Sequence, residues 1–85
     1  MRTGVQWTET IGPKQTRKWV TDKWPAEWHV VWTVMPVTPR PGSEELDWGV
    51  AVERTDADHV TYWITVHNLT NQSVTFEGRY AIMNA

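Results

Sequence analysis

The sequence predicts an all-β protein, in the form of a small antiparallel β-sandwich of immunoglobulin-like arrangement, with a small five- or six-stranded barrel as the alternative. Two observations favour this class: apolar and polar residues alternate with period two, and no segment keeps a 3.6-residue period over a helical length. A length of 85 residues suits a single domain covering residues 1–85. Six segments are expected to be strands: residues 3–11, 15–24, 26–35, 46–53, 59–67 and 73–83.

The first three strands are separated by turn-forming residues. Gly12-Pro13 splits the first from the second, and Pro25 ends the second. Trp24, Trp28 and Trp32 are spaced four apart, which would stack them on a helix, but the same spacing also serves one face of a strand. The neighbouring β-branched residues favour the strand.

The last three strands are the most regular, and they follow a Pro-rich loop at residues 36–43 that favours the sandwich. Residues 59–67 and 73–83 are expected to pair as a hairpin around a turn at residues 68–72, with Gly78 marking a bulge or a close approach. One cross-strand layer of this hairpin should be buried: Tyr62, Ile64, Val66, Phe76, Tyr80 and Ile82. The inward face of the strand at 46–53 should add Leu46, Trp48, Val50 and Val52.

Seven of the 85 residues are tryptophan, against two tyrosines and one phenylalanine. Each buried indole needs a hydrogen-bond acceptor, so tryptophan is a demanding choice for simple core filling. Tryptophan is favoured where a flat amphipathic surface meets a protein, a sugar or a base. The composition therefore indicates a binding or assembly module.

Trp63 is the strongest candidate for a binding residue, because it lies on the otherwise polar face of its strand together with His67. The expected hairpin would place Glu77 and Arg79 on the same outer face. Trp24 and Trp28, near the turn after the second strand, form a second candidate. The predicted ligand- or partner-binding residues are Trp63, His67, Arg79, Glu77, Trp24 and Trp28.

The chain contains no motif for catalysis, cofactor binding or metal binding, and we expect that it is not an enzyme. There is no cysteine, no nucleophile elbow and no glycine-rich phosphate loop. His59 and His67 share a strand face but are eight residues apart, roughly 26 Å, which is too far for one ion. No membrane segment or signal peptide is visible, so a cytoplasmic location is the default expectation.

Charge is unevenly divided along the chain. Residues 1–42 carry six basic and three acidic side chains, whereas residues 43–85 carry two basic and seven acidic ones. The halves should attract, either between strands of one molecule or between subunits. The net charge of −2 makes a nucleic-acid partner unlikely, although the basic and aromatic segment 14–19 is typical of single-strand-binding barrels. We therefore expect a non-catalytic interaction module, most simply a homo-oligomer, with a carbohydrate-binding module or lectin as the alternative.

Overall fold

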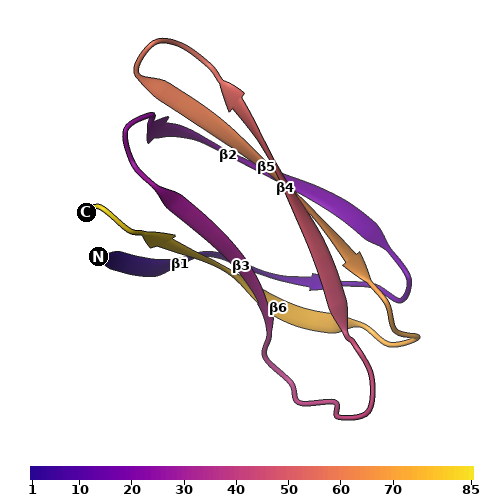
Figure 1. Ribbon diagram of the computed structural model, residues 1–85. Coiled ribbons are helices and arrows are strands. Elements are labelled where there is room, and N and C mark those ends of the chain that lie inside the picture. The colour runs from indigo at the N-terminus through magenta and orange to yellow at the C-terminus, as the bar shows by residue number, and fades with distance from the viewer.

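The computed structural model describes residues 1–85 and contains two three-stranded antiparallel sheets and no helix (Figure 1). One sheet has the strand order β1-β6-β3 and the other β2-β5-β4, an all-β architecture consistent with a small β-sandwich. The chain thus contains no helix long and apolar enough to cross a membrane. The strands are β1 (Arg2–Ile11), β2 (Thr16–Pro25), β3 (Val30–Pro36), β4 (Leu46–Arg54), β5 (His59–Asn68) and β6 (Val74–Ile82).

The alternation of apolar and polar residues located all six strands, but the predicted pairing of the last two is wrong. Strands β5 and β6 belong to different sheets, because residues 69–73 carry the chain from one layer to the other. The third strand also begins later than expected, at Val30, because Trp28 donates its backbone N–H to the carbonyl of Pro25 in a turn. The barrel alternative does not form, since no strand pair joins the two sheets.

Only one pair of consecutive strands, β4 and β5, forms a hairpin. The other four connections pass from one sheet to the other, so most strand pairs join distant parts of the sequence. Strand β1 pairs with β6, which places Arg2 opposite Ile82 and brings the two ends of the chain together (Figure 1).

Aromatic rings from both sheets meet in the interior. Trp7 of β1 stacks on Trp19 of β2 at 6.0 Å between ring centroids. Trp24 of β2 packs edge-on against Trp32 of β3 at 5.3 Å and Tyr80 of β6 at 5.2 Å. Most of the tryptophans therefore pack between the two sheets. Fewer of them are available to contact a partner than the composition led us to expect.

Two of these indoles have no hydrogen-bond acceptor. The Nε1 atoms of Trp7 and Trp32 are buried without a partner, whereas Trp24 donates to the hydroxyl of Thr21 at 2.9 Å. Leaving a buried donor unpaired costs free energy. The apolar area and the ring contacts of these side chains offset that cost.

The predicted core layer is largely confirmed. Ile64, Val66, Phe76 and Ile82 are fully buried, and the two tyrosines pack at the margin of the same cluster. Partial burial raises the pKa of the Tyr62 phenol. The layer lies between the two sheets instead of across one hairpin, because β5 and β6 face each other from opposite layers.

Gly78 marks a close approach, as expected. It pairs with Trp7, and the Trp7 ring occupies the space that a Cβ atom at residue 78 would need. A register shift between Val5 and Trp7, a β-bulge, accompanies this contact. Gly49 on β4 has no atom within 4 Å of the corresponding position.

Asn68 connects two loops at one end of the molecule. Its buried amide nitrogen lies 3.1, 2.9 and 2.8 Å from the carbonyl oxygens of Ile11, Gly12 and Gln72. Its amide oxygen accepts from the backbone N–H and the hydroxyl of Thr70. One side chain thereby fixes the β1–β2 turn and the crossing from β5 to β6.

We expect Gly78→Ala to destabilise the protein by about 1–3 kcal/mol, because the added methyl displaces the Trp7 ring. Gly49→Ala is the matched control. It should leave the free energy of unfolding unchanged or raise it by up to about 1 kcal/mol. Urea titration followed by tryptophan fluorescence measures both, and equal losses would refute the close contact.

We expect Asn68→Asp to lower the free energy of unfolding by roughly 3–5 kcal/mol at neutral pH. The substitution places a buried carboxylate against three carbonyl oxygens and removes their donor. Asn71→Asp, at an exposed position in the same loop, should change stability by less than about 0.5 kcal/mol. Thermal unfolding of both variants tests the difference.

Candidate interaction surfaces

The structure separates the predicted site residues onto opposite sides of the molecule. Trp63 and His67 lie on the outer face of the β2-β5-β4 sheet, as the alternation predicted. Glu77 and Arg79 lie on the outer face of the β1-β6-β3 sheet. The error follows from the hairpin assumption, because β6 pairs with β1 and β3 and not with β5.

Trp24 and Trp28 do not form an open platform. Trp24 is buried, and Trp28 packs edge-on against it at 6.2 Å, with the guanidinium of Arg2 5.8 Å from the Trp28 ring. Trp19, in the basic segment, is stacked on Trp7 inside the sandwich. These rings therefore offer little flat surface to a sugar or a base.

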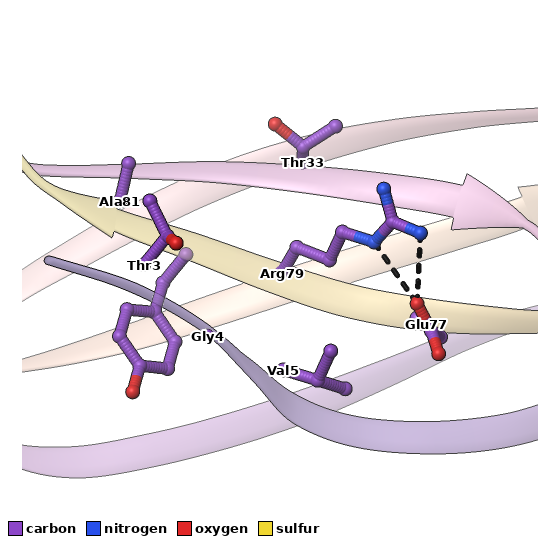
Figure 2. Close-up of a pocket in the computed structure, with 8 residues that line it drawn as sticks. Thr3, Gly4, Val5, Thr33, Glu77, Arg79 and Ala81 are labelled. Carbon is purple, nitrogen blue, oxygen red and sulfur yellow. Dashed lines mark hydrogen bonds and ion pairs between the residues drawn. The ribbon is translucent and has the colours of Figure 1, made fainter.

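Arg79 and Glu77 form an ion pair on the outer face of β6 (Figure 2). The Arg79 Nε and Nη2 atoms both donate to Glu77 Oε1, at 3.0 and 2.9 Å. The surrounding depression is shallow and is lined by small side chains of the flanking strands, among them Thr3, Val5 and Thr33. The two charges neutralise each other, but Arg79 Nη1 and Glu77 Oε2 have no hydrogen-bond partner within the chain.

Trp63 lies among small side chains and is 38% exposed. Its cross-strand neighbours are Val20 on β2 and Ala51 on β4, and the Lys18 ammonium nitrogen lies 6.0 Å from the ring centroid. Farther along the same face, His67 Nδ1 is 3.9 Å from an Asp47 carboxylate oxygen. The arrangement is a flat indole with polar groups near it, which suits either a protein contact or a sugar ring.

A second apolar surface, which we call the β4 stripe, consists of Trp48, Val50 and Val52. Their side chains lie on the face that points toward the other sheet, where they were expected to be core. They are instead 41%, 46% and 63% exposed, whereas Leu46 at the start of the strand is half-buried. Exposure rises toward the β4–β5 turn because the opposite sheet does not cover the far part of β4 (Figure 1).

The alternation in the sequence therefore identified the correct face of β4 but not its exposure. Period-two patterning specifies which side chains share a face, whereas coverage depends on where the second sheet ends. Apolar side chains that gather on an exposed protein surface can mark a contact site, so the β4 stripe is a candidate for one. The β4 stripe is a candidate interaction surface that the sequence had assigned to the core.

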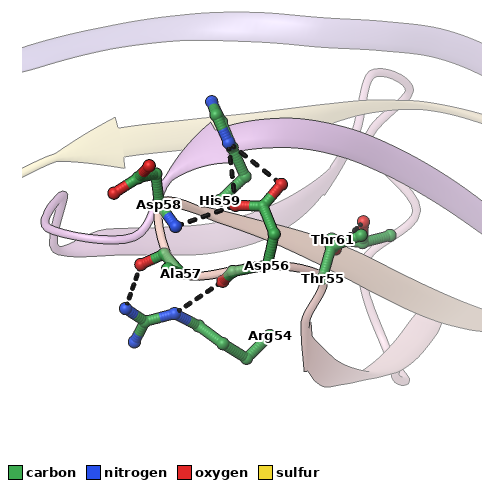
Figure 3. Close-up of polar contacts among 7 residues, drawn as sticks. All are labelled: Arg54, Thr55, Asp56, Ala57, Asp58, His59 and Thr61. Atoms are coloured by element: carbon green, nitrogen blue, oxygen red, sulfur yellow. Dashed lines mark hydrogen bonds and ion pairs between the residues drawn. The ribbon is translucent and has the colours of Figure 1, made fainter.

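The turn that ends β4 is held by a local hydrogen-bond network (Figure 3). Arg54 donates to the carbonyl oxygens of Asp56 and Ala57. The Asp56 carboxylate accepts from the Asp58 N–H at 2.8 Å and lies 3.1 Å from His59 Nδ1. The Asp58 N–H, and next the His59 ring, hold the pKa of Asp56 below its usual value of 3.8.

None of the three close contacts between acidic and basic side chains joins the basic and acidic halves of the chain. They link Asp56 to His59, Asp47 to His67, and Glu77 to Arg79, all within residues 43–85. The attraction expected between neighbouring strands is therefore not realised as direct contacts inside one molecule.

Because the pKa of Asp56 is lowered in the folded state, its ionised form stabilises the turn above the unfolded pKa, and this contribution is lost as pH falls through the folded value. We expect Asp56→Asn to lower the thermal midpoint at pH 7. The difference from the parent protein should shrink as the pH falls below 3.8. A pH-independent difference, measured by circular dichroism, would contradict the role of the carboxylate charge.

The exposed aromatic surface is thus divided between the outer face around Trp63 and the β4 stripe. No family profile, no curated protein and no solved structure matches this chain. The functional assignment accordingly depends on the chemistry of these two surfaces.

Proposed function

We propose that this protein is a non-catalytic interaction module that self-associates through the β4 stripe. The observation that carries the proposal is the exposure of Trp48, Val50 and Val52 on the core-facing side of a sheet. These side chains are apolar, as the side chains of a protein core are, yet they are exposed to solvent.

Removing the β4 stripe from water would favour association. Burial of apolar surface contributes about 25 cal/mol per Å², and aromatic anchors dominate the energy of many protein interfaces. The uncovered parts of three side chains are far less than the roughly 800 Å² per partner of a standard interface. The contact must therefore include neighbouring backbone or side chains, and a weak, concentration-dependent oligomer is expected.

The immunoglobulin-like arrangement is part of this proposal. Its support is the strand order, since β2-β5-β4 and the pair β3-β6 correspond to strands B-E-D and C-F of immunoglobulin domains. Trp32 is buried on β3, the strand that corresponds to C, where immunoglobulin domains carry a buried tryptophan. Strand β1 takes the position beside β6 that strand G has in those domains.

Carbohydrate binding is the second candidate, and the surroundings of Trp63 favour it. A half-exposed indole lies on a face that also carries Lys18, His67 and Asp47. Indoles stack on sugar rings while charged side chains hydrogen-bond hydroxyl groups. A monomeric protein that binds on a glycan array, and loses that binding in Trp63→Ala, would favour this candidate over self-association.

Val50→Thr combined with Val52→Thr tests the main proposal. Threonine keeps the β-branched shape while it replaces a methyl group by a hydroxyl, so strand β4 should persist and the apolar contact should weaken. Sedimentation equilibrium over micromolar to millimolar concentrations should show self-association of the parent protein and a dissociation constant at least about tenfold higher for the double variant.

Val5→Thr combined with Val31→Thr is the matched control, because these valines are 50% and 49% exposed but lie on the other sheet. This control pair should leave self-association unchanged. A parent protein that stays monomeric throughout, or equal weakening in both double variants, would refute the proposal.

A further inference from the structure

The free edge of β4 presents a regular row of unpaired backbone groups. Thr55 donates its N–H to the His59 carbonyl, and Leu69 donates to the carbonyl of Glu45, one pair beyond each end of the β4–β5 ladder. Hydrogen-bonded pairs alternate along an antiparallel ladder, so the odd-numbered residues of β4 bond to β5. The N–H and C=O groups of Trp48, Val50 and Val52 therefore point away from β5, along the edge.

The other three sheet edges carry features that hinder strand addition. Strand β1 has a register shift at Val5 and Trp7, and β2 has one between Thr21 and Trp24, where Lys23 adopts a φ of 62°. Strand β3 is seven residues long and ends at Pro36. Bulges, charges, prolines and short lengths are the usual means of blocking edge pairing.

Strand β4 has no bulge, proline or short length to protect it, and its charged residues, Asp47, Glu53 and Arg54, lie near its two ends. Its nine residues pair with β5 without a register shift and include no proline and no lysine. A long, regular edge with apolar side chains favours the addition of another strand. Antiparallel addition of the same strand from a second copy gives the two-fold symmetry of most homodimers.

We propose that two copies of this chain pair through β4 in antiparallel orientation, forming a continuous six-stranded sheet with its two-fold axis at Ala51. This inference rests on the proposed self-association and specifies its geometry. The β4 stripes of both copies then lie side by side on one face of the joined sheet.

The side chains select the register. If the two-fold axis of the paired β4 strands lay at Val50, Asp47 of one copy would lie opposite Glu53 of the other. If the axis lay at Gly49, Glu45 would lie opposite Glu53. Like charges directly opposite each other destabilise a sheet.

The register centred on Ala51 keeps carboxylates of the paired strands apart. Val50 faces Val52 of the other copy on the inner side, and Arg54 faces Trp48, a cation opposite an indole. Shifting the centre to Val52 would shorten the overlap and leave Trp48 beyond the paired strand.

Because the chain has no cysteine, single cysteines can report this register directly. Residues at the two-fold axis form a non-hydrogen-bonded pair, with Cα atoms about 4.5 Å apart. That separation falls within the range for a disulfide. We expect Ala51→Cys to form a reducible covalent dimer on mild oxidation, visible on a non-reducing gel.

Glu53→Cys is the matched control, since residue 53 lies on the same outer face of the same strand. Two copies of it would be separated by four strand positions, roughly 13 Å, which is too far for a disulfide. Cross-linking of Ala51→Cys at least tenfold above Glu53→Cys supports the pairing. Comparable yields, or preferential linking of Gly49→Cys or Val50→Cys, would overturn the proposed register.

Val50→Pro tests the backbone contribution separately. It keeps an apolar side chain but removes an N–H that points away from β5, so the fold should survive as proline does on edge strands. We expect at least a tenfold loss of dimer in sedimentation, with an unchanged circular dichroism spectrum. Association that is unaffected by this substitution would refute edge pairing.

These outcomes separate the inference from the proposed function. If the threonine double variant weakens association but Ala51→Cys does not cross-link, the β4 stripe is a contact surface and the edge pairing is wrong. If the parent protein does not associate at all, both are wrong.

Discussion

The contact between the two aromatic layers is the constraint on which this structure depends. The sheets share no hydrogen-bonded strand pair, and the chain has no disulfide to join them. Trp7 against Trp19, and Trp24 against Trp32, connect strands of opposite sheets. A chain of 85 residues can build only a thin core with little apolar area, so large rings supply contacts that many smaller side chains would otherwise provide. The unpaired indole N–H groups are a cost of that solution.

The same constraint explains how far the sequence could predict the fold. Alternation along each strand arises from local geometry, so it located six strands and the inward positions of residues such as Ile64 and Phe76. The sheet to which a strand belongs is not local. Strands β5 and β6 are neighbours in sequence, and their short connection resembles a hairpin turn, yet Asn68 directs the chain into the other layer.

The candidate site was predicted only in part for a similar reason. Trp63 was placed on the outer face correctly, because that conclusion needs only the alternation of β5. Placing Arg79 and Glu77 beside it required the strand pairing, and that pairing was wrong. Trp48 was assigned to the core because its neighbours are apolar, but its burial depends on the extent of the opposite sheet. How far the opposite sheet extends is decided only when the two sheets assemble, so the local sequence of β4 does not reveal it.

The position of β6 has a consequence for folding during synthesis. This strand is the centre of its sheet and follows both β1 and β3 in the sequence, so these two strands lack their partner until β6 has been made. The β2-β5-β4 sheet contains the one local hairpin and can form earlier. During that interval the inner rings of β1 and β3 have no sheet to support them. The aromatic interior can therefore close only after β6 has been synthesised.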